Sequence, residues 1–226
     1  MLDIPVSETP AMDFSGAGSL PASAPQTHPT PPRTSGVPLK KGEKLSISKP
    51  DAPLDSLTVG LGWDAPGGEP PYDLDAEVFL LGDNDKVVGD SWFVYYNQAA
   101  SPDGAVLHEG DSRDGAGGGD DEAIRVRLSR LSPQVKKLAF VVTINEARAR
   151  AQSFGAVKNA YIRIIDDASG RELARFNLTD YYSTVYSMVA GELYLRNGEW
   201  KFNPVGDGTA DDLAGLCRRY GVNVSD

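Results

Sequence analysis

Negative charge is concentrated in one stretch of this chain. Residues 64–122 contain fifteen Asp or Glu and only two basic residues, although the net charge of all 226 residues is −10. Acid that served solubility alone would be spread over the surface, whereas clustered like charges repel one another. This concentration of acid therefore indicates a site for cations. Nucleic acid is disfavoured as a partner, because phosphate binding needs a basic stripe.

Short runs of β-branched and aromatic residues recur along the chain, bounded by Gly, Pro, Asn and Asp. This pattern predicts an all-β fold, and we expect a two-sheet β-sandwich with short helices. In residues 123–128, aliphatic residues alternate with Arg125 and Arg127, which predicts a strand with one buried face. The expected strands are residues 44–48, 57–61, 74–81, 92–97, 123–128, 137–144, 160–166, 171–178, 191–196 and 199–204.

Turn and capping residues predict one hairpin and two helices. The pair Asn197-Gly198 favours a two-residue hairpin loop, because a type I′ turn needs positive φ at both central positions. A C-terminal amphipathic helix is expected after a capping box in which Thr209 is the cap and Asp212 stands in the usual Glu place, and Gly221 would end it. Its apolar residues recur at helical spacing: Leu213, Leu216, Cys217 and Tyr220. A second, short helix is expected at residues 146–153, where Ala and Arg dominate.

The first 37 residues differ in composition from the rest of the chain. They hold seven of the sixteen prolines and nine Ser or Thr, so we expect a disordered tail at 1–37 and one folded domain at 38–226. The tail lacks the basic and apolar regions of a signal peptide, and apolar runs elsewhere are too short to span a bilayer. A single cysteine cannot form an internal disulfide. We expect a cytoplasmic protein without a transmembrane segment.

Two acidic segments offer oxygen ligands for a cation. In Asp-Leu-Asp-Ala-Glu, residues 73–77, the carboxylates alternate and share one face of the expected strand, while Leu74, Ala76 and Val78 share the other. Residues 110–122 read Gly-Asp-Ser-Arg-Asp-Gly-Ala-Gly-Gly-Gly-Asp-Asp-Glu. Calcium takes roughly six to eight oxygens in flexible geometry, whereas zinc favours His or Cys. Because Val78 stands where an EF-hand loop requires Gly, we expect a composite site built from loops.

The candidate ligands lie in both acidic segments and in neighbouring loops. They are Asp64, Asp73, Leu74, Asp75, Asn97, Asp103, Gly104, Asp111, Ser112, Asp114, Gly119, Asp120, Asp121 and Glu122. For Asp83, Asp85 and Asp90 we favour ordinary turn chemistry. The glycines of residues 110–122 would let the chain wrap closely around an ion, so we expect this segment to become ordered when calcium binds.

Several ordered segments resemble the TerD family of tellurium-resistance and stress proteins, over residues 37–224. The similar segments are residues 59–64, 72–76, 93–97, 101–104, 110–122, 140–144, 152–155, 191–194, 198–202 and 217–221. The resemblance implies a β-sandwich that binds calcium, for which we expect a pair of ions. The corresponding segment of the family usually reads nearer Gly-Asp-Asn-Arg-Thr-Gly. In this chain Ser112 replaces the Asn and offers a weaker oxygen, and Asp114 replaces the Thr and adds a charge.

The resemblance further implies a protein that is not an enzyme and acts in cytoplasmic assemblies near the inner face of the membrane. The expected partners are other tellurite-resistance or stress proteins, including a membrane-associated complex, and no small-molecule substrate is expected. Two alternatives stay open. One is a hydrolase that uses paired carboxylates, as in glycoside hydrolysis, although Trp63 and Trp92 are the only nearby tryptophans that could form a sugar platform. The other is a sandwich that binds a partner without an ion.

Overall fold

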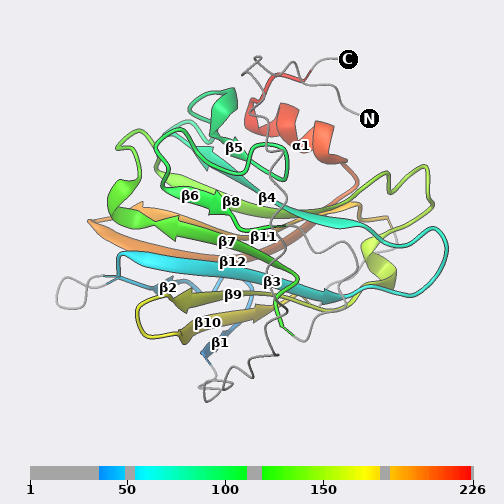
Figure 1. Ribbon diagram of the computed structural model, residues 1–226, viewed down its shortest axis with the longest axis horizontal. Coiled ribbons are helices and arrows are strands. Elements are labelled where there is room, and N and C mark those ends of the chain that lie inside the picture. Colours follow the sequence, from blue (N-terminus) through cyan, green and yellow to red (C-terminus); the bar gives the residue numbers. More distant parts are fainter. Residues whose placement is uncertain (1–35, 49–53, 111–118, 179–183, 225–226) are drawn as a thin grey trace, which may run out of the picture.

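Two six-stranded sheets face each other in the computed structural model, which describes residues 36–48, 54–110, 119–178 and 184–224 (Figure 1). In spatial order, the first sheet is β1 (Val37–Leu39), β10 (Arg171–Asn177), β9 (Lys158–Asp166), β3 (Ser56–Asp64), β7 (Glu122–Arg127) and β6 (Val106–His108). The second is β2 (Leu45–Ser46), β12 (Glu199–Thr209), β11 (Ser187–Arg196), β8 (Lys137–Ile144), β4 (Leu74–Leu81) and β5 (Phe93–Val94). The expected two-sheet β-sandwich is confirmed.

The main core lies between the two sheets. On β3, Leu57, Val59 and Leu61 face inward and are fully buried, and Ile124 and Val126 of β7 face the same way. Inward residues of β9 in the same sheet, and of β4 and β8 in the facing sheet, complete this core. Strong alternation therefore marks strands whose outer face is not covered, as the sequence of β7 indicates.

A second apolar cluster covers the outer face of the second sheet. The helix α1 (Leu213–Tyr220) packs there, and its buried residues Leu216, Cys217 and Tyr220 meet Phe79 and Val141. This explains why β8 is apolar at successive positions, since it is buried on both faces. The helix is confirmed, but its expected cap is wrong: Thr209 ends β12, and Asp212 is the N-cap, whose side chain accepts a hydrogen bond from Gly215 N. The helix ends as expected at Gly221, which has φ of 84°.

Residues 146–153 are a series of turns, so the expected helix is wrong there. Glu146 and Ala151 have φ of 53° and 52°, a left-handed conformation that interrupts helical hydrogen bonding. The short 3₁₀ helix η3 (Phe154–Ala156) follows. Two further 3₁₀ helices, η1 (Asp90–Trp92) and η2 (Leu128–Arg130), shorten the strands expected at residues 92–97 and 123–128.

The turns predicted elsewhere in the chain are confirmed. Asn197 and Gly198 have φ of 54° and 76° and join β11 to β12, as a type I′ hairpin requires. Asp83 and Asp85 lie in the turn after β4, and Asp90 begins η1. The strand β6 was not expected, because three residues carry too little pattern to be recognised. The tail expected at residues 1–37 lies outside the described residues except for 36 and 37, and β1 begins at Val37.

The helices bear on membrane insertion and on the reactivity of Cys217. Within the described ranges, no helix is long and apolar enough to cross a membrane. Cys217 lies on the buried face of α1, where burial, and next the charge of Glu77, raises the pKa of its thiol to about 12. The thiolate, which is the reactive form, is therefore scarce near neutral pH.

Cys217 should consequently resist alkylation in the native protein. At a pH near 8, with iodoacetamide in excess, we expect native Cys217 to react at least about a hundredfold more slowly than an exposed thiol, because only about one thiol in ten thousand is ionised at this pKa. The adduct is measured by mass spectrometry, and protein unfolded in guanidinium gives the reference rate. Equal rates in both states would show that the thiol is accessible.

Candidate metal centre

Three strand ends that carry acidic residues meet at one end of the sandwich. β3 ends there at Asp64, β4 begins at Leu74 just after Asp73, and β7 begins at Glu122. The antiparallel pairs Leu61↔Glu122 and Leu74↔Ile144 fix these positions within each sheet. Figure 1 shows β3 ending at the right of the molecule, where the chain turns back into β4. We call this the acidic end, and define it by Asp64, residues 73–75 and residues 119–122.

Nine of the candidate ligands belong to the acidic end or to the chain that returns to it. They are Asp64, Asp73, Leu74, Asp75, Asn97, Gly119, Asp120, Asp121 and Glu122. Asn97 joins them because β5 runs antiparallel to β4 with Val94 opposite Val78, so the chain after β5 returns toward the start of β4. Asp111, Ser112 and Asp114 lie outside the described residues.

The structure places Asp103 and Gly104 at the opposite end of β7. Arg127, the last residue of β7, donates from its backbone N to the Ala105 oxygen at 2.7 Å. The Asp103 carboxylate accepts from Ser101 Oγ at 2.6 Å and from Ser132 N at 2.8 Å. It therefore holds its own turn in shape, and the fold separates it from the acidic end.

Amide side chains orient the two outermost carboxylates. Asn159 Nδ2 donates to Asp64 Oδ2. Asn145 donates from Nδ2 to Asp73 Oδ2 at 3.0 Å, and from its backbone N to the Asp73 carbonyl at 2.8 Å. Gln152 Nε2 donates to the Pro70 and Pro71 carbonyls at 2.8 and 3.2 Å, which fixes the chain that leads into Asp73. These amides are uncharged, so the charge pattern that marks the carboxylates does not indicate their role.

Asp121 and Glu122 are buried between the strands. Asp121 is 7% exposed, and its Oδ2 accepts a hydrogen bond from Trp63 N at 2.7 Å. Glu122 is 1% exposed, and its Oε2 lies 3.1 Å from His108 Nε2. The same His108 nitrogen lies 3.1 Å from the Ala76 carbonyl, so His108 links β6 of the first sheet to β4 of the second.

Asp120 lies on the outer face of the first sheet, in contact with Arg163 and Tyr161. Burial, and next the charge of Asp120, raises the pKa of Tyr161 to about 12. For Arg163, burial opposes the charge, but the hydrogen bonds and charge of Asp120 outweigh it and raise the pKa. Arg163 is therefore a permanent cation beside Asp120, and no local pattern indicates this pairing because the two residues are 43 positions apart.

Glu77 is the carboxylate whose environment is most unusual. As expected, Asp75 and Glu77 share the face opposite the core residues Leu74, Ala76 and Val78. Glu77 is fully buried, Thr143 Oγ1 donates to its Oε1 at 2.7 Å, and Oε2 has no hydrogen-bond partner within the described chain. Burial, and next the charge of Asp75, raises the pKa of Glu77 well above its usual range. A buried oxygen that lacks a donor is of the kind that a hard cation would satisfy.

The described acids do not by themselves form a complete ligand set. Within residues 36–48, 54–110, 119–178 and 184–224, no three His, Cys, Asp or Glu side chains lie close enough together to hold a metal ion. Asp75 lies on the outer face of the second sheet and Asp120 on that of the first. Two facing sheets lie about 10 Å apart, so these two carboxylates cannot bind the same ion in this arrangement.

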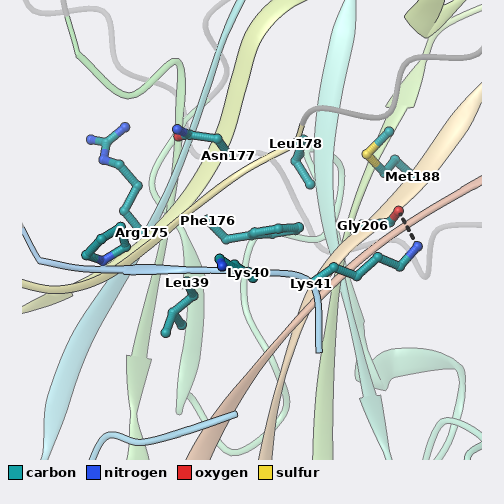
Figure 2. Close-up of a pocket in the computed structure, with 10 residues that line it drawn as sticks. Leu39, Lys40, Lys41, Arg175, Phe176, Asn177, Leu178, Met188 and Gly206 are labelled. Atoms are coloured by element: carbon teal, nitrogen blue, oxygen red, sulfur yellow. Dashed lines mark hydrogen bonds between the residues drawn. The ribbon is translucent and has the colours of Figure 1, made fainter. Parts of the chain in front are cut away.

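A separate cavity of about 280 Å³ opens between β1 and β10 of the first sheet and β11 and β12 of the second (Figure 2). Phe176, Leu178 and Met188 form its apolar walls, and Lys41 Nζ donates to the Gly206 carbonyl at 3.2 Å. No carboxylate is among the described residues that line it. This cavity therefore offers a cation no ligands of the kind found at the acidic end.

The fold and the acidic end define a class of proteins: β-sandwiches that gather carboxylates where their strands end. Residues 36–220 match the family model of the TerD domain. The chain is 49% identical over 190 residues to the tellurium resistance protein TerD of Serratia marcescens, covering 84% of this chain and 99% of that protein. It is 42% identical over 191 residues to general stress protein 16U of Bacillus subtilis (strain 168), covering 83% and 98%.

This chain belongs to the TerD family, among proteins of tellurium resistance and the stress response. A solved structure has the same fold: a homologue of telluride resistance protein (TerD) from Streptomyces coelicolor A3(2), with a TM-score of 0.57 and 24% identity. The similarity covers 73% of this chain and 95% of that one. The expected family is thus confirmed.

Proposed function

We propose that this protein is a calcium-binding, non-catalytic module of a tellurite-resistance or general stress response, acting in the cytoplasm. Calcium binding would complete the fold of the acidic end and allow assembly with other stress proteins, including a complex at the inner face of the membrane. The observation that carries this proposal is the meeting of β3, β4 and β7 at one end, which gathers Asp64, residues 73–75 and residues 119–122.

The residues that would hold calcium come from two groups. Asp73 and Asp75, with the carbonyl of Leu74, belong to β4 and its approach, and the Oε2 atom of Glu77 lacks a donor on the same face as Asp75. Asp121 and Glu122 belong to β7 and its approach. Two residues separate them in the sequence from residues 111–118, which include Asp111, Ser112 and Asp114. Bound calcium would supply positive charge that offsets the repulsion among these carboxylates.

Isothermal titration tests the proposal directly. We expect calcium uptake by the purified chain, and we expect Asp75→Asn to weaken it by at least about tenfold, because a charged oxygen beside the ion is lost. Asp83→Asn is the matched control: it removes the same charge at the opposite end of β4, where Asp83 is exposed, and should change affinity by less than about twofold. No uptake by the unaltered chain would refute calcium binding.

A further inference from the structure

The carboxylate of Asp120 is held at both oxygens by side chains of β9. Arg163 donates from Nε to Oδ1 at 2.7 Å and from a terminal nitrogen to Oδ2 at 2.8 Å. Tyr161 donates to Oδ1 at 2.8 Å, and its hydroxyl lies 2.8 Å from the Gly119 carbonyl as well. A two-point Arg–carboxylate pair fixes orientation as well as distance. Asp120 is therefore held against the sheet, although it lies within the acidic segment of residues 110–122.

Two glycines of β3 make this arrangement possible. A Cβ atom at Gly60 would lie 2.1 Å from Asp120 Oδ2, and one at Gly62 would lie 2.5 Å from the Tyr161 ring. Both distances are far below a van der Waals contact, so any side chain at either position would displace the group lying over it. The Gly-Leu-Gly sequence in β3 is thus explained by the space that Asp120 and Tyr161 require.

Arg163 is anchored on its far side as well. Arg163 donates from its second terminal nitrogen to Glu172 Oε2 at 3.1 Å, and Arg175 donates to the same carboxylate at 3.0 and 3.2 Å. The Arg175 guanidinium lies 3.9 Å from the centre of the Tyr161 ring. The Arg163 side chain, 25% exposed, is thus held between two carboxylates: Asp120, just before β7, and Glu172 of β10. Its position does not depend on a bound ion.

We propose that Asp120 is a positioning residue of the calcium site and does not bind the ion itself. Held by Arg163 and Tyr161 in the space left by Gly60, it fixes the end of the acidic segment, so that Asp121 and Glu122 are already in place before calcium arrives. Groups that orient metal ligands commonly contribute ten- to hundredfold in affinity. This inference rests on the proposed calcium binding.

Simple electrostatics predicts the opposite effect, which makes the inference testable. Removing the positive charge of Arg163 lessens its repulsion of calcium and frees a carboxylate, so both Coulomb attraction and direct ligation by Asp120 would tighten binding. Loss of positioning weakens it. The sign of the change in Arg163→Gln therefore decides between the two roles of Asp120.

Calcium titration of four chains provides the test: unaltered, Arg163→Gln, Gly60→Ala and Lys137→Gln. We expect Arg163→Gln and Gly60→Ala each to weaken calcium binding by about tenfold or more. Gly60→Ala changes no charge, so its loss of affinity would come from displacing Asp120. Lys137→Gln is the control, since Lys137 is equally 25% exposed and ion-paired, but to Asp85 and Glu192 away from the acidic end. Equal or tighter binding by Arg163→Gln would overturn the proposal.

Hydrogen exchange without calcium separates this inference from the proposed function. The amide of Asp121 donates to the Leu61 carbonyl at 2.8 Å, directly beside Asp120. We expect this amide to exchange at least about tenfold faster in Arg163→Gln and Gly60→Ala than in Lys137→Gln, while β8 keeps its protection. If the unaltered chain takes up no calcium, the proposed function fails. Separately, if the Asp121 amide exchanges at the same rate in Arg163→Gln and Gly60→Ala as in Lys137→Gln, Asp120 does not fix the residues that follow it.

Discussion

Calcium is expected to raise the melting temperature of this protein by roughly 5–10 °C. A ligand that binds only the folded state, at a hundred times its Kd, adds about 2.7 kcal/mol to the free energy of unfolding. In a domain of this size, each kcal/mol shifts the melting temperature by about 2–4 °C. We expect this effect because calcium would bind the acidic end only in the folded chain. Differential scanning calorimetry measures it.

Three controls test whether the rise in melting temperature comes from calcium bound at the acidic end. A chelator should reverse it, and magnesium at the same concentration should give less, because magnesium prefers to keep several of its waters. Asp75→Asn should lose most of the gain, whereas Asp83→Asn should keep it. A melting temperature that is the same with calcium and with chelator would favour a sandwich that binds its partners without an ion.

Phe79→Ala is expected to lower the free energy of unfolding by about 3–5 kcal/mol, because it leaves a cavity that the rigid sheet cannot close. Phe79 is fully buried on the outer face of β4. Its ring centre lies 4.4 Å from that of Phe93 and 4.5 Å from that of Tyr220 in α1. The substitution therefore removes the main aromatic contact that holds α1 on the second sheet, and the melting temperature should fall by about 10 °C.

The matched control for Phe79→Ala is Leu195→Ala, also in the second sheet. Leu195 is 42% exposed, so its removal should cost no more than about 0.5 kcal/mol. In Phe79→Ala, hydrogen exchange of the α1 amides should become faster, while the amides of β3 and β9 should stay the more strongly protected ones. Similar losses in both variants would mean that α1 contributes little to stability.

Local sequence patterns were sufficient to predict most of the strands and the C-terminal helix. The alternation in β7, the apolar run of β8, the Asn197-Gly198 turn and the end of α1 at Gly221 are each set by residues within a few positions of one another. The helix expected at residues 146–153 failed because helix propensity is a weak preference, and the tertiary fold there imposes left-handed conformations at Glu146 and Ala151.

The candidate site was only partly accessible to the same reasoning. Strand alternation placed Asp75 and Glu77 correctly on one face, because a period of two is a local property. Asp103 looked equivalent to the other acids in sequence, yet it lies at the far end of β7 and holds its own turn. Local pattern gives the face on which a carboxylate lies, and it does not give the end of the sandwich to which the chain carries it.

The sequence by itself determined the all-β class, the C-terminal helix, the family resemblance and the concentration of acid in residues 64–122. Only the tertiary structure decided which acids share an end of the sandwich, that Glu77 is fully buried, and that Asp120 is held by Arg163 in the space above Gly60. The physical reason is range. Propensity, alternation and charge density act between near neighbours in the chain, whereas ion pairs and close packing join strands whose residues are more than forty positions apart.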